Sequence, residues 1–145
     1  MCRTLIYLVC CTFMLSLGGE ARADLVGYWD LDEGGGNVAH DRSGNDNHGT
    51  LNGPEWEAGL YGQALRFNGT DSYVEVPTSE SLEIDGQVTA AAWINWADSG
   101  DTWLCVMANG QQNGPWENYG LFVNRTSRFA YFTLALDGGH VTQQT

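Results

Sequence analysis

The stretch from Asp41 to Pro77 decides the fold class of this chain, and it opens with Asp41-Arg42-Ser43-Gly44-Asn45 and closes with Tyr73-Val74-Glu75-Val76-Pro77. Between these ends, short apolar runs alternate with glycines, as in Ala64-Leu65-Arg66-Phe67-Asn68-Gly69. Val74 and Val76 point away from Tyr73 and Glu75 if the segment is extended, which is the period-two spacing of a half-buried strand. The stretch therefore predicts glycine-punctuated β-structure without helix.

The same period of two continues on both sides of this stretch. Residues Leu25 to Leu31 alternate and predict a strand, whereas Val88 to Trp96 is apolar at nearly every position. Such a continuous run predicts a strand covered on both faces in the middle of a sandwich. Tyr119 to Val123 and Phe129 to Leu136 predict a hairpin. With 19 glycines to form turns, we expect a single antiparallel β-sandwich.

The order of these motifs resembles the laminin-G-like domains of bacterial secreted proteins, a branch of the concanavalin A-like jelly rolls. The resemblance runs from about Leu25 to the end and rests on the glycines after Asp41, the Phe67 to Val76 block, Ser81-Leu82, and Thr89-Ala90-Ala91-Ala92-Trp93-Ile94. It implies an all-β, concanavalin A-like antiparallel jelly roll that binds sugars or acts in adhesion. In that family further strands follow the hairpin, so the resemblance also implies a domain incomplete at its C-terminal side, with open strand edges for self-association.

Residues 1–23 have the layout of a secretory signal peptide. Arg3 precedes an apolar run from Leu5 to Leu17, and Ala21-Arg22-Ala23 supplies the small residues of a cleavage site. The apolar run is shorter than the ~20 residues that a membrane span needs. We therefore expect cleavage after Ala23, one mature domain over 24–145, and secretion to the periplasm, the cell surface or the medium without a membrane anchor.

Charge and cysteine content restrict the partners and the means of stabilisation. The full chain carries −12 and the mature part −13, because the leader holds two arginines and one glutamate. So acidic a protein is not expected to bind nucleic acid or anionic membranes. Three of the four cysteines lie in the leader, so Cys105 is the single cysteine of the mature part and no intramolecular disulfide can form there. Packing or a metal must therefore stabilise the mature domain.

Oxygen-bearing side chains in two turns suggest a calcium site. The loop Asp41 to Gly49 presents Asp, Ser and Asn side chains of the kind that calcium takes, although it fails as an EF-hand because Asp46 stands where that loop needs glycine. Edge loops of concanavalin A-like and laminin-G-like domains often hold calcium. The resemblance therefore favours calcium without fixing its ligands, and Asp41 is the first candidate ligand, with Asn68 and Asp71 of the following turn as its companions. The alternative is a turn network in which these side chains bond neighbouring backbone amides.

Aromatic rings near polar loop residues are the candidates for carbohydrate binding. Of the six tryptophans, Trp29, Trp93 and Trp96 fall inside strand patterns and are expected in the core, whereas Trp56, Trp103 and Trp116 lie near Gly, Pro, Asp or Asn. There an indole face can stack on a sugar ring beside a few polar groups. The predicted carbohydrate-binding residues are Trp103, Asn109, Gln111, Asn113, Trp116 and Tyr119. The alternative is that each ring caps the end of the sandwich.

Enzymatic activity is not expected from this sequence. Glu83-Ile84-Asp85-Gly86 matches only the start of the Glu-x-Asp-x-x-Glu strand of jelly-roll glucanases, because Gln87 and Val88 stand where the third acid would fall. The expected function is that of a secreted, non-catalytic module for carbohydrate or glycoprotein binding and cell adhesion. Two alternatives stay open: an accessory part of a polysaccharide-degrading glycoside hydrolase whose catalytic residues lie outside this chain, and a structural spacer of a surface protein.

Overall fold

The structure is a computed structural model that describes residues 23–84, 86–96, 102–110, 118–136 and 139–144. The predicted signal peptide lies outside these residues, except for Ala23. Nine strands in three antiparallel sheets make up the described part, together with one turn of 3-10 helix, η1 (Glu80–Leu82). The all-β class is therefore confirmed. In the described ranges, no helix is long and apolar enough to cross a membrane.

Two small sheets form in the first half of the chain. One has the order β1-β2-β5 and the other pairs β3 with β4. The bounds are β1 (Val38–Ala39), β2 (Gly49–Asn52), β3 (Glu55–Ala58), β4 (Gln63–Arg66) and β5 (Tyr73–Glu75). Gly49 is buried where β2 meets β5, and a Cβ there would collide with the Val74 side chain. Strand β5 confirms the period-two prediction at Tyr73 to Glu75.

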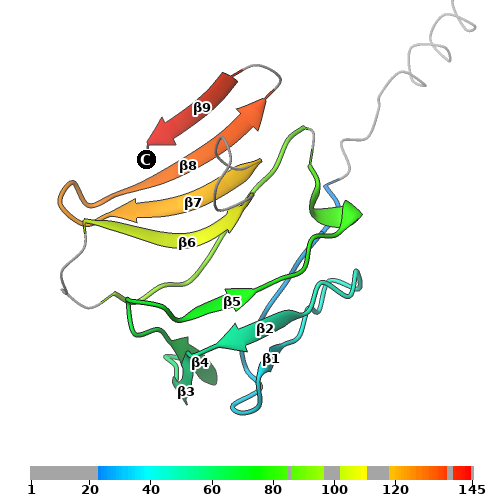
Figure 1. Ribbon diagram of the computed structural model, residues 1–145, viewed down its shortest axis with the longest axis vertical. Helices are drawn as coiled ribbons and strands as arrows, with labels where there is room; N and C mark the ends of the chain where they lie inside the picture. The colour runs from blue at the N-terminus through cyan, green and yellow to red at the C-terminus, as the bar shows by residue number, and fades with distance from the viewer. Residues whose placement is uncertain (1–22, 85, 97–101, 111–117, 137–138, 145) are drawn as a thin grey trace, which may run out of the picture.

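The second half of the chain forms a four-stranded sheet of consecutive strands in the order β6-β7-β8-β9 (Figure 1). The strands are β6 (Trp103–Asn109), β7 (Tyr119–Asn124), β8 (Phe129–Leu136) and β9 (Gly139–Gln144). Between β7 and β8, the Asn124 side-chain oxygen accepts hydrogen bonds from the backbone N–H groups of Thr126 at 3.1 Å and Ser127 at 2.9 Å. This turn closes the hairpin that the sequence predicts, and the pairing of β7 with β8 confirms it.

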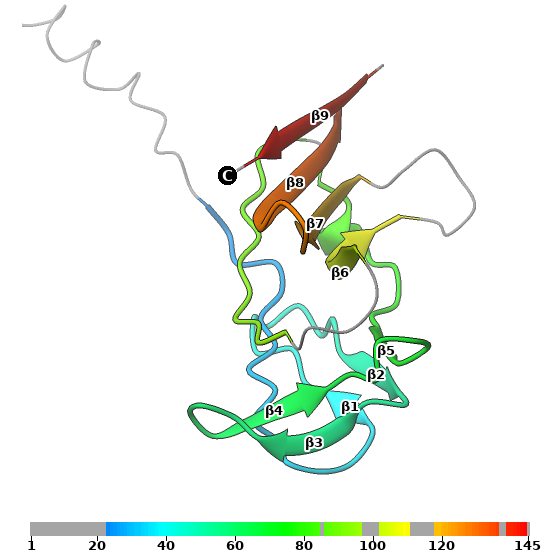
Figure 2. The ribbon, with the colours of Figure 1, turned by 90° about the vertical axis from the view of Figure 1, so that its left-hand side faces the viewer.

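Two predicted strands do not form. In the segment 25–31, Trp29 makes only an isolated bridge with Asp41. Residues 86–96 run past one face of the four-stranded sheet without joining any described sheet (Figure 2). Trp93 is fully exposed and Trp96 is partly exposed, so the prediction of a strand covered on both faces was wrong. Apolar composition favours burial, but burial also needs neighbouring strands, and no described strand pairs with this segment.

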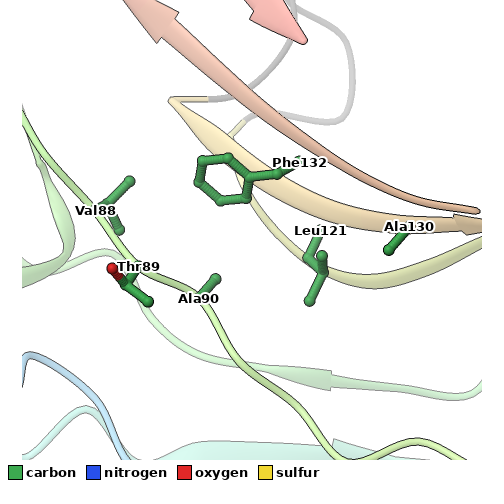
Figure 3. A pocket seen from close by; sticks show the side chains of 6 residues that line it. All are labelled: Val88, Thr89, Ala90, Leu121, Ala130 and Phe132. Atoms are coloured by element: carbon green, nitrogen blue, oxygen red, sulfur yellow. The ribbon is translucent and has the colours of Figure 1, made fainter. Parts of the chain in front are cut away.

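The hydrophobic core of the described part is small. Its buried apolar residues are Ala39, Tyr119 and Val123. The register of β7 and β8 pairs Leu121 with Phe132, so these two side chains lie on the same face of the four-stranded sheet, which we call its inner face. The segment 86–96 faces this surface at a distance that leaves a cavity of about 290 Å³ between them (Figure 3). The segment and the sheet are therefore not closely packed against each other.

Candidate functional site

The buried carboxylate of Asp41 holds together the loop Asp41 to Gly49, which is the predicted calcium site. Asp41 is only 7% exposed. Its Oδ1 accepts hydrogen bonds from the backbone N–H groups of Tyr28 at 2.9 Å and Ser43 at 2.8 Å. Its Oδ2 accepts hydrogen bonds from Ser43 Oγ at 2.7 Å and from the backbone N–H of Asn47 at 3.0 Å. Four protein donors thus satisfy this carboxylate and tie the N-terminal segment to the loop.

These donors also control the ionisation of Asp41. Burial by itself raises the pKa of the carboxyl, because it disfavours the charged form. The hydrogen bonds from the Ser43 hydroxyl and from the backbone amides of Tyr28, Ser43 and Asn47 outweigh burial and lower the pKa from 3.8 to about 2. Asp41 is therefore an ionised anchor for neighbouring amides, which is the arrangement of the turn network.

The other two calcium candidates lie in the turn between β4 and β5. Asn68 Oδ1 accepts hydrogen bonds from the backbone N–H groups of Thr70 at 2.9 Å and Asp71 at 3.1 Å, and Asn68 Nδ2 donates to Asp71 Oδ1 at 2.7 Å. Each candidate is thus bonded within its own turn. Across the described ranges, no three His, Cys, Asp or Glu side chains are grouped to hold a metal ion. Calcium binding stays a prediction.

Two of the predicted carbohydrate-binding residues turn inward. Tyr119 is only 8% exposed, and its hydroxyl donates to the Leu82 carbonyl oxygen at 3.2 Å. Asn109 Nδ2 donates to the same oxygen at 2.6 Å. Both side chains therefore fasten the four-stranded sheet to η1, and the ring of Tyr119 does not offer a face to a ligand. Gln111, Asn113 and Trp116 lie outside the described residues.

Trp103 instead joins a group of rings on the outer face of the four-stranded sheet. Register pairs Trp103 with Asn124 and Asn124 with Phe129, and in the same way it aligns Cys105, Phe122 and Tyr131. Cross-strand partners point to the same side of a sheet, so all six residues share one face. We call its four rings the aromatic face; they are Trp103, Phe122, Phe129 and Tyr131. It is opposite the face of Leu121 and Phe132 that borders the cavity.

The aromatic face is open to solvent and contains hydroxyl groups. Trp103 is 53% exposed and packs edge-to-face on Tyr131, with ring centroids 4.9 Å apart and planes at 60°. The Tyr131 hydroxyl lies 3.5 Å from Ser127 Oγ in the turn that follows β7. None of the residues in β6 to β9 is Asp, Glu, Lys or Arg. The surface thus offers ring faces and neutral hydrogen-bonding groups.

Reasoning from the sequence found Trp103 but missed the three rings beside it. The apolar runs that contain Phe122, Phe129 and Tyr131 predict strands, but they do not by themselves indicate a binding surface. Their spacing carried a signal, because residues two apart in a strand share a face and Phe129 and Tyr131 are two apart. The hairpin register was needed to add Trp103 and Phe122 to them.

The chain matches no family model, no curated protein and no solved structure. The Leu82 carbonyl oxygen anchors the sheet that carries the aromatic face, whereas the hydrogen bonds of the Asp41 carboxylate stay within the first half of the chain.

Proposed function

We propose that this chain is a secreted, non-catalytic module of laminin-G-like, concanavalin A-like jelly-roll type that binds carbohydrate, free or on a glycoprotein, through the aromatic face. The observation that carries the proposal is the exposure of Trp103 beside Tyr131 on an uncharged sheet. An indole presents a broad apolar surface that stacks on the C–H face of a sugar ring, while nearby hydroxyls bond its oxygen atoms.

The chemistry of the aromatic face favours a neutral glycan over the other ligand classes. Phosphorylated or sulfated ligands need cationic groups; the strands β6, β7, β8 and β9 themselves contain no lysine or arginine, and Arg125 and Arg128 lie outside them in the β7–β8 turn. Retaining glycoside hydrolysis needs two carboxyl groups about 5 Å apart, and these strands contain no acid. Stacking and neutral hydrogen bonds remain, and a neutral sugar uses both.

Substitution of Trp103 tests the proposal. Wild type and Trp103→Ala are compared on an array of neutral and acidic glycans. We expect the variant to bind its best neutral glycan about tenfold more weakly, because loss of a stacked indole removes on the order of 1.4 kcal/mol of binding free energy. Tyr61→Ala is the matched control, since Tyr61 is an aromatic ring that is 89% exposed in the turn between β3 and β4.

Three results distinguish the alternatives. Loss of glycan binding in Trp103→Ala but not in Tyr61→Ala supports the aromatic face as the site. Binding to insoluble polysaccharide without binding to soluble glycans would favour the accessory part of a glycoside hydrolase. Absence of binding to every glycan, or equal loss in both variants, would refute the proposal and leave the structural spacer.

A further inference from the structure

The segment 86–96 leaves its backbone unpaired beside the four-stranded sheet. It belongs to none of the three sheets, and its backbone makes no hydrogen bond to another described residue. Side chains on it are correspondingly open, with Trp93 fully exposed and Ile94 partly exposed. An unpaired row of N–H and C=O groups is a template to which another strand can add.

A cavity lies between this segment and the four-stranded sheet. Val88, Thr89 and Ala90 line it on one side, and Leu121, Ala130 and Phe132 line it on the other (Figure 3). The side chains that line it are apolar apart from that of Thr89. A strand added next to 86–96 would carry further apolar side chains toward Leu121 and Phe132 and would complete the thin second layer.

The sequence of the segment is complementary to itself. Ala91 stands at its centre, and antiparallel pairing of two copies about a twofold axis there places Val88 of one opposite Ile94 of the other. The same register pairs Thr89 with Trp93 and Gln87 with Asn95. Apolar residues thus meet apolar or β-branched ones, and the two amides meet each other. The small alanines at the centre allow close approach of the two backbones.

The distribution of charge restricts where a second copy can pair. Residues 24–101 contain fifteen acidic and two basic residues, while 102–145 contain two of each. A cationic partner would be attracted to the acidic half, and two copies would repel one another through it. Residues 86–96 are free of Asp, Glu, Lys and Arg, so this strip is a surface on which two like-charged copies can meet.

We propose that a second copy of this chain pairs antiparallel with residues 86–96, forming a twofold dimer with Ala91 on the axis. The pairing supplies hydrogen-bond partners to both unpaired segments and covers the cavity of each copy with residues such as Ile94 of the other. The pairing takes place on the side of the sheet that carries Leu121 and Phe132, opposite the aromatic face. It therefore leaves the aromatic face free and does not depend on glycan binding.

Sedimentation equilibrium of the full chain tests the dimer. We expect a concentration-dependent monomer–dimer equilibrium that tightens as salt is raised, because salt screens the repulsion between the two acidic halves. Val88→Lys places two like charges in the pairing, and we expect it to weaken association at least about tenfold. Leu60→Lys is the control, since Leu60 is exposed in the β3–β4 turn and lies outside the pairing.

Cross-linking tests the register without relying on a disruptive variant. Ala91→Cys is made with every natural cysteine replaced by serine, and two such residues on the axis would lie about 4.5–5.5 Å apart at Cα, within the range that a disulfide spans. We expect it to form a covalent dimer at least about tenfold faster than Leu60→Cys in the same background. A monomer at all concentrations, a dimer that Val88→Lys leaves intact, or equal cross-linking at positions 91 and 60 would overturn the proposal.

Discussion

At the scale of single residues, Asp41 has the clearest stabilising role. Its carboxylate is buried and accepts four hydrogen bonds, and its pKa is lowered to about 2 in the folded chain. A group with a lowered folded pKa stabilises the fold above its unfolded pKa, and that contribution is lost as the pH falls through the folded pKa. For Asp41 the loss therefore falls between about pH 4 and pH 2.

We expect Asp41→Asn to lower the free energy of unfolding by on the order of 2 kcal/mol at pH 7, because the amide removes the charge and turns a donor toward backbone N–H groups. Urea unfolding followed by tryptophan fluorescence measures the loss. Since protonation weakens the same interactions in the wild type, the difference between the two chains should shrink as the pH approaches 2.

Asp46→Asn is the control for this experiment. Asp46 is exposed, and its Oδ1 lies 3.9 Å from His48 Nε2. We expect a change below about 0.5 kcal/mol, as is usual for an exposed ion pair. Equal destabilisation by the two substitutions would show that Asp41 has no special role in the loop.

The two interpretations of the Asp41 loop show where sequence reasoning ends at this scale. Calcium ligation and backbone capping both use Asp, Ser and Asn at short spacing, so the loop alone fits either. The backbone amide of Tyr28 is one of the groups that occupy Asp41, and it lies 13 residues earlier in the chain. No local pattern predicts that contact, because it depends on how the N-terminal segment packs.

At the scale of elements, the carbonyl of Leu82 joins η1 to the four-stranded sheet. Asn109 from β6 and Tyr119 from β7 both donate to it. We expect Tyr119→Phe to cost about 1 kcal/mol of stability, because Asn109 still satisfies the oxygen. The double variant with Asn109→Ala should cost more than the two single variants combined, since it leaves the carbonyl without either donor.

The same variants separate an anchoring role from a sugar contact. Urea unfolding gives the double-mutant cycle, and the glycan array gives binding. We expect Tyr119→Phe to bind its glycan as the wild type does, because this ring is buried away from the aromatic face. Weaker glycan binding with unchanged stability would instead support the original prediction that Tyr119 contacts the sugar.

The strand predictions succeeded where a strand pairs with its neighbour in the sequence. The hairpin of β7 and β8 was predictable because its turn is short and its strands are neighbours in sequence. The segment 86–96 carried an equally strong apolar pattern but does not pair with any described strand. Apolar composition predicts that the side chains of a segment need to be buried. It does not predict which residues bury them, because those can be distant in the chain or belong to another chain.

At the scale of the whole molecule, export is the first prediction. We expect the exported chain to begin at Asp24, because Ala21 and Ala23 are the small residues that signal peptidase requires next to the cut. Intact-mass measurement of exported protein tests this. Replacing Ala23 by phenylalanine should leave the precursor uncut, and exported wild-type protein that retains Met1 would contradict the prediction.

The uneven distribution of charge in the molecule should make dimerisation depend on salt, and with it the area of apolar surface that is exposed to water. Almost all acidic residues of the mature part lie in 24–101. Two copies therefore repel each other at low ionic strength, where the Debye length is tens of ångströms and the repulsion is weakly screened. Monomers then leave the cavity between 86–96 and the sheet open. Raising the salt shortens the screening length to about 10 Å or less and favours the dimer that covers this cavity.

Nile red, an uncharged dye that fluoresces in apolar sites, reports this surface directly. We expect its fluorescence per chain to fall as protein concentration rises at fixed high salt, because pairing of two 86–96 segments removes apolar area from water. Val88→Lys should keep the signal high at the same concentrations, whereas Leu60→Lys should follow the wild type. Fluorescence per chain that stays constant across concentration and salt would mean that the exposed apolar strip of one copy is not covered by another.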